Sequence, residues 1–280
     1  MSQSQQAITI NCFNNSSILK NTDMFLMINA LNSLLPAFCS VWSPKPYICQ
    51  AAPATIKQGS SGLYCAFMDT SDVVGALAYH SESSAVSFGK VFVNTILKYN
   101  GAILIGATPS VPTVAQAFAH EIFEMIVNAN VNTWWQRSDG SLVPAEVCDP
   151  VQGNAVTVKV GTSSVNLSDY ILPAWANPQA TIGPFNFLNT LTKPFQLAKG
   201  GYVIVMKGST VSQVMGETVS DYVKWKADES AAELNAVFQQ QAPLVPEVLP
   251  VVPEVVPEVL PVVPDVPVTP LPQSEPAVQQ

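Results

Sequence analysis

The chain has 280 residues, of which 48% are hydrophobic and 11% are charged, so it can bury a substantial core. Its formal net charge of −8 excludes a surface built to hold phosphates. Residues 241–280 contain acids but no Lys or Arg, which leaves the rest of the chain close to neutral. We therefore expect no nucleic-acid partner.

Neither the cysteines nor the amino terminus indicates secretion. The five cysteines are an odd number without a C-x-x-C pair, which favours reduced thiols. Residues 1–6 are polar and do not form a signal sequence. The apolar stretch 24–42 is interrupted by asparagines and a proline, which favours an amphipathic helix over a membrane span. We expect a cytoplasmic or virion-associated protein without a membrane partner.

The first hundred residues predict a mixed sheet with one helix across it. Apolar residues at three-and-four spacing between Met24 and Phe38 predict the helix. Segments rich in β-branched and aromatic residues, bounded by turn formers, predict strands at residues 7–13, 47–51, 63–68, 75–80 and 90–94.

A buried strand is predicted at residues 101–106, an apolar run bounded by glycines. The next helix is expected from about Pro112 to Val127, with Ser110 as its cap. This helix is apolar except for one histidine and two carboxylates. Burying unpaired carboxylates costs free energy, so these side chains predict a partner such as a metal ion.

The charged residues of this helix have the spacing H-E-x-x-E. His120 and Glu124 lie one turn apart on the same face, so both can reach one ion. Glu121 could then act as the base, as the glutamate does in H-E-x-x-H metallopeptidases. Here Glu124 stands in place of the second histidine. The alternative is a helix with a partly solvated polar stripe.

A third ligand is expected from residues 142–150, which predict a strand that returns past the helix. Glu146 and Asp149 are its only acids, and either could complete the metal site or simply cap a turn. Cys148 is a weaker candidate, because its neighbours favour a buried thiol. His80 and Tyr170 are candidate partners for an oxyanion.

Downstream, a hairpin is predicted around residues 161–164 and a last strand at residues 200–206. The proline-rich residues contain an eleven-residue repeat, 245–255, that recurs at 256–266 with one change. Such a tail is expected to be disordered and extended, serving as a spacer or binding a protein partner. The expected divisions are a domain at 1–208, an extension with a short helix from Ser230 at 209–241, and the tail at 242–280.

The segments His120 to Met125 and Glu146 to Val151 resemble a largely uncharacterised family of bacterial and viral proteins. That family has a zincin-like H-E-x-x-E helix and an E-V-C-D-P strand. The resemblance extends over most of residues 20–207 and implies a metallopeptidase-like fold. The chain departs from the family at Asn128-Ala129, where Asp-Pro is expected. If that acid holds metal in the relatives, this chain lacks it.

Together these features predict an α+β, zincin-like fold with a helix that carries the active site. The first functional hypothesis is a zinc-dependent hydrolase, metallopeptidase-like, acting on a peptide or protein substrate. In it, His120, Glu124 and either Glu146 or Asp149 hold zinc, and Glu121 is the base. The alternative is a non-enzymatic viral or host-interaction protein that keeps the scaffold and uses its tail for attachment.

Overall fold

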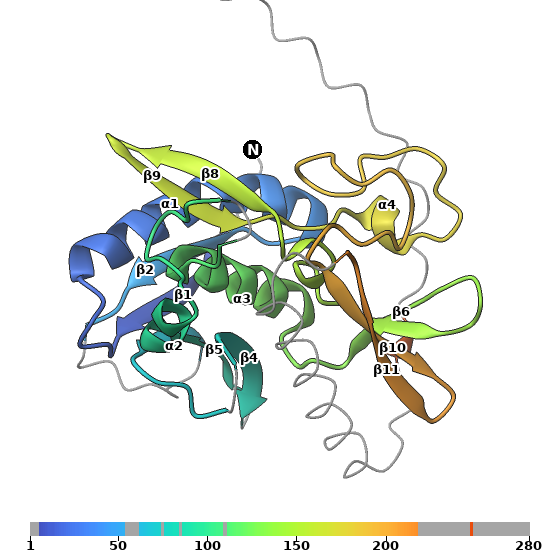
Figure 1. The fold of residues 1–280 in the computed structure, drawn as a ribbon, viewed down its shortest axis with the longest axis horizontal. Coiled ribbons are helices and arrows are strands. Elements are labelled where there is room, and N and C mark those ends of the chain that lie inside the picture. Colours follow the sequence, from blue (N-terminus) through green and yellow to red (C-terminus); the bar gives the residue numbers. More distant parts are fainter. Residues whose placement is uncertain are drawn as a thin grey trace, which may run out of the picture. The chain divides into compact units, whose positions relative to one another are not determined.

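The computed structural model describes residues 6–53, 62–73, 76–83, 86–108 and 111–217, together with the backbone of residues 247–248. Within this part of the chain the fold is mixed α/β, with several sheets and helices (Figure 1). The mixed class predicted from the sequence is confirmed. The short helix expected from Ser230 and nearly all of the proline-rich tail lie outside the described residues.

The first sheet contains five strands in the order β2-β1-β3-β5-β4. Its strands are β1 (Ile8–Asn14), β2 (Tyr47–Ala51), β3 (Leu63–Met68), β4 (Ala78–Ser83) and β5 (Val86–Phe92). Neighbours pair in parallel except for β4, which runs antiparallel to β5 and places His80 opposite Gly89. Parallel strands are normally covered on both faces, and β3 is accordingly almost completely buried.

Two segments expected to be strands have a different structure. The fifth strand ends at Phe92, and Val93–Lys98 form the short helix α2. Residues 101–106 contain only an isolated bridge at Ala102. The carbonyls of this segment instead accept from the first turn of the next helix, at 2.9 Å from Val114 N to Ala102 O and 3.0 Å from Ala115 N to Ile103 O. The first N–H groups of a helix have no hydrogen-bond partner within the helix. Two carbonyls of this apolar segment supply those partners and do not pair with a neighbouring strand.

The helix α1 (Asn21–Trp42) contacts β2 and also packs on α3, β8 and β9. Among the described residues it is the one helix long and apolar enough to cross a membrane by length and composition. In this structure Met27, Leu31, Leu35 and Phe38 are fully buried in the core. The prediction of an amphipathic helix packed on a sheet is confirmed.

The second sheet has the order β11-β10-β7-β6-β12. Its strands are β6 (Thr133–Gln136), β7 (Leu142–Pro144), β10 (Tyr202–Lys207), β11 (Thr210–Met215) and β12 (Glu247–Val248). The prediction that the strand at 200–206 is the last is wrong, because β11 pairs with β10 across the turn at Gly208. The sequence also predicted no ladder within the tail, yet β12 pairs in parallel with β6. The pairing is short, and prolines stand at positions 246 and 250 on either side of it.

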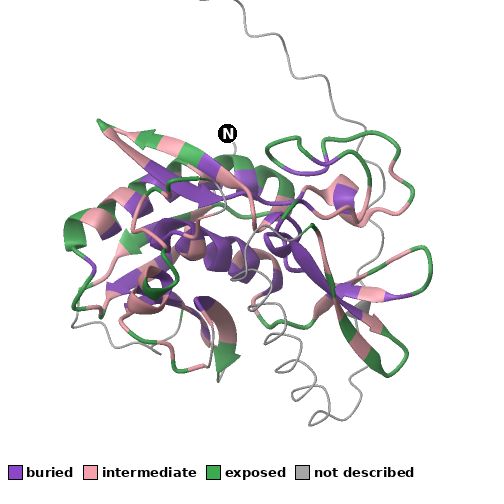
Figure 2. Ribbon diagram, in the orientation of Figure 1, coloured by how far each residue is buried: buried purple, intermediate pink, exposed green. Residues whose placement is uncertain are grey.

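The predicted hairpin is confirmed as β8 (Ala155–Val160) and β9 (Ser163–Ser168), and a short helix, α4 (Pro173–Ala176), follows it. The central helix α3 (Val114–Asn128) contacts β4 and β5 as well as α1 and β9 (Figure 1). Its N-cap is Thr113, whose hydroxyl accepts from Gln116 N at 2.9 Å, whereas Ser110 lies outside the described residues. Figure 2 shows that α3 is buried along most of its length.

Candidate metal centre

The aromatic residue Phe123 anchors α3 on the side away from its charges. Its ring stacks on Phe38 at 4.3 Å between centroids and meets the edge of Tyr170 at 5.1 Å. Tyr170 also stacks on Phe187 at 5.0 Å, so it belongs to an aromatic cluster. The structure therefore places the ring of Tyr170, a candidate oxyanion partner, in an aromatic cluster that includes Phe123 and Phe187.

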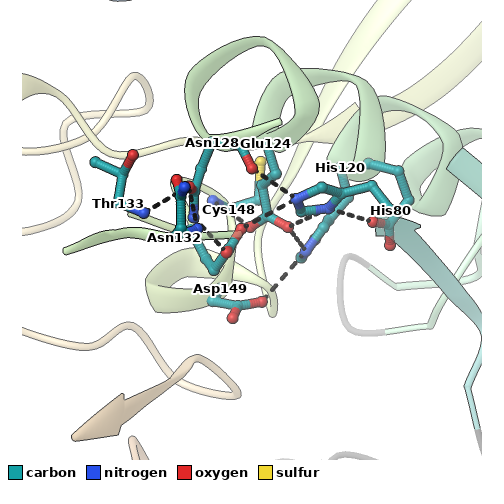
Figure 3. Close-up of polar contacts among 10 residues, drawn as sticks. His80, His120, Glu124, Asn128, Asn132, Thr133, Cys148 and Asp149 are labelled. Atoms are coloured by element: carbon teal, nitrogen blue, oxygen red, sulfur yellow. Dashed lines mark hydrogen bonds and ion pairs between the residues drawn. The ribbon is translucent and has the colours of Figure 1, made fainter. Parts of the chain in front are cut away.

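The charged face of α3 meets the segment that follows β7. Nε2 of His120 lies 3.0 Å from Glu124 Oε2 and 3.2 Å from Asp149 Oδ1 (Figure 3). Tetrahedral zinc with bonds of about 2.0 Å places its ligand atoms roughly 3.3 Å apart. Each of the two carboxylates therefore lies about as far from His120 as two ligands of one ion lie from each other, and in the absence of an ion both acids can accept from the imidazole. A ligand atom of Cys148 also lies within 4.8 Å of those of His120 and Glu124.

Asp149 reaches His120 from a turn and not from a strand, which corrects the sequence prediction. β7 ends at Pro144, and Asp149–Val151 form a single 3₁₀ turn. Cys148 N donates to Glu124 Oε1 at 3.0 Å. Because its hydrogen bonds go to α3 and to loops, this segment cannot form a regular ladder. A Cβ on Gly201 would lie 2.1 Å from Pro150 O, so only glycine allows the chain before β10 to approach the turn so closely.

His80 enters the cluster from β4. Its Nδ1 lies 3.2 Å from Glu121 Oε2 and 3.9 Å from Glu124 Oε2. Its Nε2 lies 3.3 Å from the carbonyl of Asn128 and 3.7 Å from Glu146 Oε2. The structure thus places His80 at the site, and Glu124 faces both histidines.

The two acids that the sequence offered as alternatives take different places. Asp149 lies beside His120, whereas Glu146 lies beside His80. Asn128 Nδ2 donates to Glu146 Oε1 at 2.8 Å, and its Oδ1 accepts from the backbone of Asn132 and Thr133. Asn128 therefore orients an acid of the cluster. Glu146 Oε2 is buried without a hydrogen-bond partner, which is consistent with a place left for a cation.

Burial and mutual repulsion make this cluster hold protons tightly. Burial raises the pKa of Glu146 well above its usual value, and the Glu124 carboxylate raises it further. Burial alone would lower the pKa of His80, but Glu146, Glu121 and Glu124 together raise it to about 10. The pKa of His120 is likewise raised, against burial, chiefly by Glu124 and Asp149. A metal ion would have to displace these protons, so its binding is expected to depend on pH.

Tyr202, on β10, also belongs to the site, although the sequence analysis did not identify it. Burial raises the pKa of Tyr202 well above its usual value, as do the Asp149 and Glu124 carboxylates, and its hydroxyl is hydrogen bonded to Asp149. Its position in an ordinary apolar strand carries no signal for this role.

The donor atoms are imidazole nitrogens and carboxylate oxygens, with one thiol nearby. This combination suits zinc and other first-row divalent metals, and it does not select one of them. No protein-family model, curated protein or solved structure matches the chain. The site's function must therefore be argued from its geometry.

Proposed function

We propose that the protein is a zinc-dependent hydrolase of peptide bonds with a zincin-like fold, and that the charged face of α3 is its active site. The observation that carries this proposal is the convergence of His120, Glu124 and Asp149 beside Glu121. His120 has the carboxylates of Glu124 and Asp149 at 3.0 Å and 3.2 Å, close to the distance between two ligands of one zinc ion. A purely structural ion would not need an additional carboxylate on the next position of the helix.

Each residue has a defined part in the proposed reaction. Zinc at this position would polarise the scissile carbonyl and acidify a bound water. His120, Glu124 and Asp149 hold the ion, and the backbone N–H of Cys148 fixes Glu124 by donating to Oε1. Glu121 accepts the proton of the attacking water and passes it to the leaving amine.

Two neighbours support these residues. Nδ1 of His80 is 3.2 Å from Glu121 Oε2, a contact that orients the proposed base. The raised pKa of Tyr202 keeps its phenol protonated, so it donates to Asp149 and fixes that carboxylate. Mutating such supporting residues typically costs roughly 10–100-fold in metal affinity or activity.

A second candidate function is non-enzymatic attachment to a viral or host partner through the tail. The observation in its favour is that β6 pairs with β12, a segment of the proline-rich repeat, so the edge of this sheet accepts an extended strand. Truncation after residue 241 separates the two functions. The hydrolase proposal expects peptide cleavage to survive this truncation, whereas the attachment proposal expects partner binding to be lost.

The hydrolase is tested by measuring the metal content of the purified protein and its cleavage of a peptide library. Glu121→Gln should lower the rate by at least about 100-fold, because the proton acceptor is removed, while an ion remains bound at His120. Glu82→Gln is the matched control, since Glu82 is an exposed acid on β4. The proposal fails if His120→Ala does not change the metal content, or if Glu121→Gln cleaves as fast as the wild type.

A further inference from the structure

The cluster contains more negative charge than a single divalent cation can balance. Its four carboxylates are all buried, with exposed fractions of 4% for Glu121, 3% for Glu124, 9% for Glu146 and 6% for Asp149. With neutral histidines and one divalent cation, two negative charges would remain. Buried charges are costly unless they are paired, so these carboxylates need either protons or a further cation.

We propose that a second divalent cation binds between His80 and Glu121, and that Glu124 is shared between the two metal positions. Nδ1 of His80 lies 3.2 Å from Glu121 Oε2 and 3.9 Å from Glu124 Oε2. These three side chains form a ligand group separate from that of His120. Glu124 Oε2 is also 3.0 Å from Nε2 of His120, so one carboxylate faces both positions.

The surroundings of His80 suit a ligand role for Nδ1. Nε2 lies 3.3 Å from the carbonyl of Asn128, which can only accept a hydrogen bond. In a neutral ring the proton then resides on Nε2, and the lone pair of Nδ1 points toward Glu121 and Glu124. Metal-binding histidines commonly donate their other N–H to a carbonyl or carboxylate in this way.

Glu146 is the fourth buried carboxylate of the cluster and lies on the Nε2 side of His80. Its Oε2 is buried without a hydrogen-bond partner and lies 3.7 Å from Nε2 of His80. With two divalent cations and neutral imidazoles, the four carboxylates are balanced. Imidazole and carboxylate ligands suit zinc, manganese or iron at this second position.

This inference takes the first metal position, at His120, from the proposed function; the second position does not depend on it. Glu121 binds the second cation through Oε2, and the proton transfer of the proposed reaction then uses Oε1 of the same carboxylate. The competing arrangement has one cation and a doubly protonated His80 that donates to both Asn128 and Glu121. The two arrangements differ by one bound metal ion per chain.

The test is the zinc stoichiometry of the full chain, measured by elemental analysis and by calorimetric titration into the chelator-treated protein. The wild type should bind two zinc ions, whereas His80→Ala and Glu121→Gln should each bind one. Glu124→Gln, which alters the shared ligand, should weaken both sites. Glu82→Gln should still bind two ions, because this acid is exposed.

Folding of each variant is checked by circular dichroism, and His80→Gln serves as a second variant that can still donate to the Asn128 carbonyl. Saturation of the wild type at one zinc ion, or an unchanged stoichiometry in both His80 variants, would overturn the inference. Cleavage by a protein with one ion would refute the second site and leave the hydrolase standing. Two bound ions without any cleavage would support the second site and refute the hydrolase.

Discussion

Two regions of the molecule bury carboxylates, and they do so in different ways. Asp169, which is 0% exposed, accepts hydrogen bonds from neutral donors on both oxygens. The donors are the side-chain amides of Asn154 at 2.9 Å and Asn186 at 2.6 Å, and the backbone N–H groups of Tyr170 at 2.9 Å and Leu188 at 3.2 Å. Burial still raises the pKa of Asp169, although these donors oppose the effect.

The acids around α3 instead face one another and two histidines. Asn128 donates to one oxygen of Glu146, while the other oxygen has no hydrogen-bond partner. A carboxylate surrounded by neutral donors is complete without a ligand, whereas several carboxylates turned toward one space need cations or protons. Asp169 is thus a structural acid, and the acids around α3 are candidate ligands.

The largest expected effect is on the pH dependence of stability in the metal-free protein. The folded-state pKa of His80 is raised to about 10, above its unfolded value of 6.5. The folded protein therefore binds this proton more tightly, and the stabilisation is complete below pH 6.5 and lost as the pH rises to 10. One such proton contributes about 1.4 kcal/mol per pH unit, so the total is on the order of 5 kcal/mol.

This loss is measured by urea unfolding of chelator-treated protein across that pH range. His80→Gln should flatten the slope, with a residual contribution from His120, whose pKa is also raised. Zinc should oppose the loss at high pH, because deprotonated ligands bind it better. A slope that is equally steep in His80→Gln would contradict the assignment to this residue.

The carboxylate-to-amide change Asp169→Asn should reduce stability by roughly 3 kcal/mol. The new NH₂ group would face the donors of Asn154 or Asn186, leaving buried hydrogen-bond donors unpaired. Denaturant unfolding with and without zinc measures the change. The loss should be the same in both conditions, and a zinc-dependent loss would show that Asp169 is not purely structural.

The same carboxylate-to-amide change in the cluster, Glu146→Gln, should increase stability, whereas Asp169→Asn reduces it. Burial and Glu124 raise the pKa of Glu146, so at neutral pH the folded protein must hold a proton that the unfolded chain releases, and this costs stability. Replacing it with an amide should stabilise the metal-free protein by about 2 kcal/mol. The thermal midpoint of the chelator-treated Glu146→Gln variant should lie above that of the chelator-treated wild type. A fall as large as that expected for Asp169→Asn would show that the acids around α3 are structural in the same way as Asp169.

The smallest effect is expected for Asn128→Asp, which places a further acid beside Glu146. This change removes the amide that donates to Glu146 Oε1 and places two carboxylates together. Without metal, the variant should lose about 1 kcal/mol of stability. Because added negative charge attracts a cation, zinc should stabilise this variant more than the wild type. Paired thermal melts with and without zinc measure the difference, which would be absent if the cluster binds no cation.

Local sequence patterns predicted several elements because their determinants are short-range. The three-and-four spacing identified α1, Pro112 and a nearby cap residue identified α3, and the spacing of His120 and Glu124 places both on one face of α3. The hairpin β8–β9 was predicted because its turn residues lie between two strand-like segments. Residues 101–106 were misassigned because an apolar run predicts burial but does not show which backbone groups its carbonyls bind. Here two of these carbonyls accept from the start of α3 and not from a neighbouring strand.

The sequence by itself determined that a buried helix carries His120, Glu121 and Glu124, since helical spacing alone aligns them. Only the tertiary structure decided that Asp149 joins His120, that Glu146 turns to His80, and that Tyr202 contacts Asp149. These side chains come from three separate parts of the chain, namely β4, the segment that follows β7, and β10. Packing and hydrogen bonds between these distant segments set the positions of the side chains. Helical periodicity cannot specify such contacts, because they depend on how separate elements pack around α3.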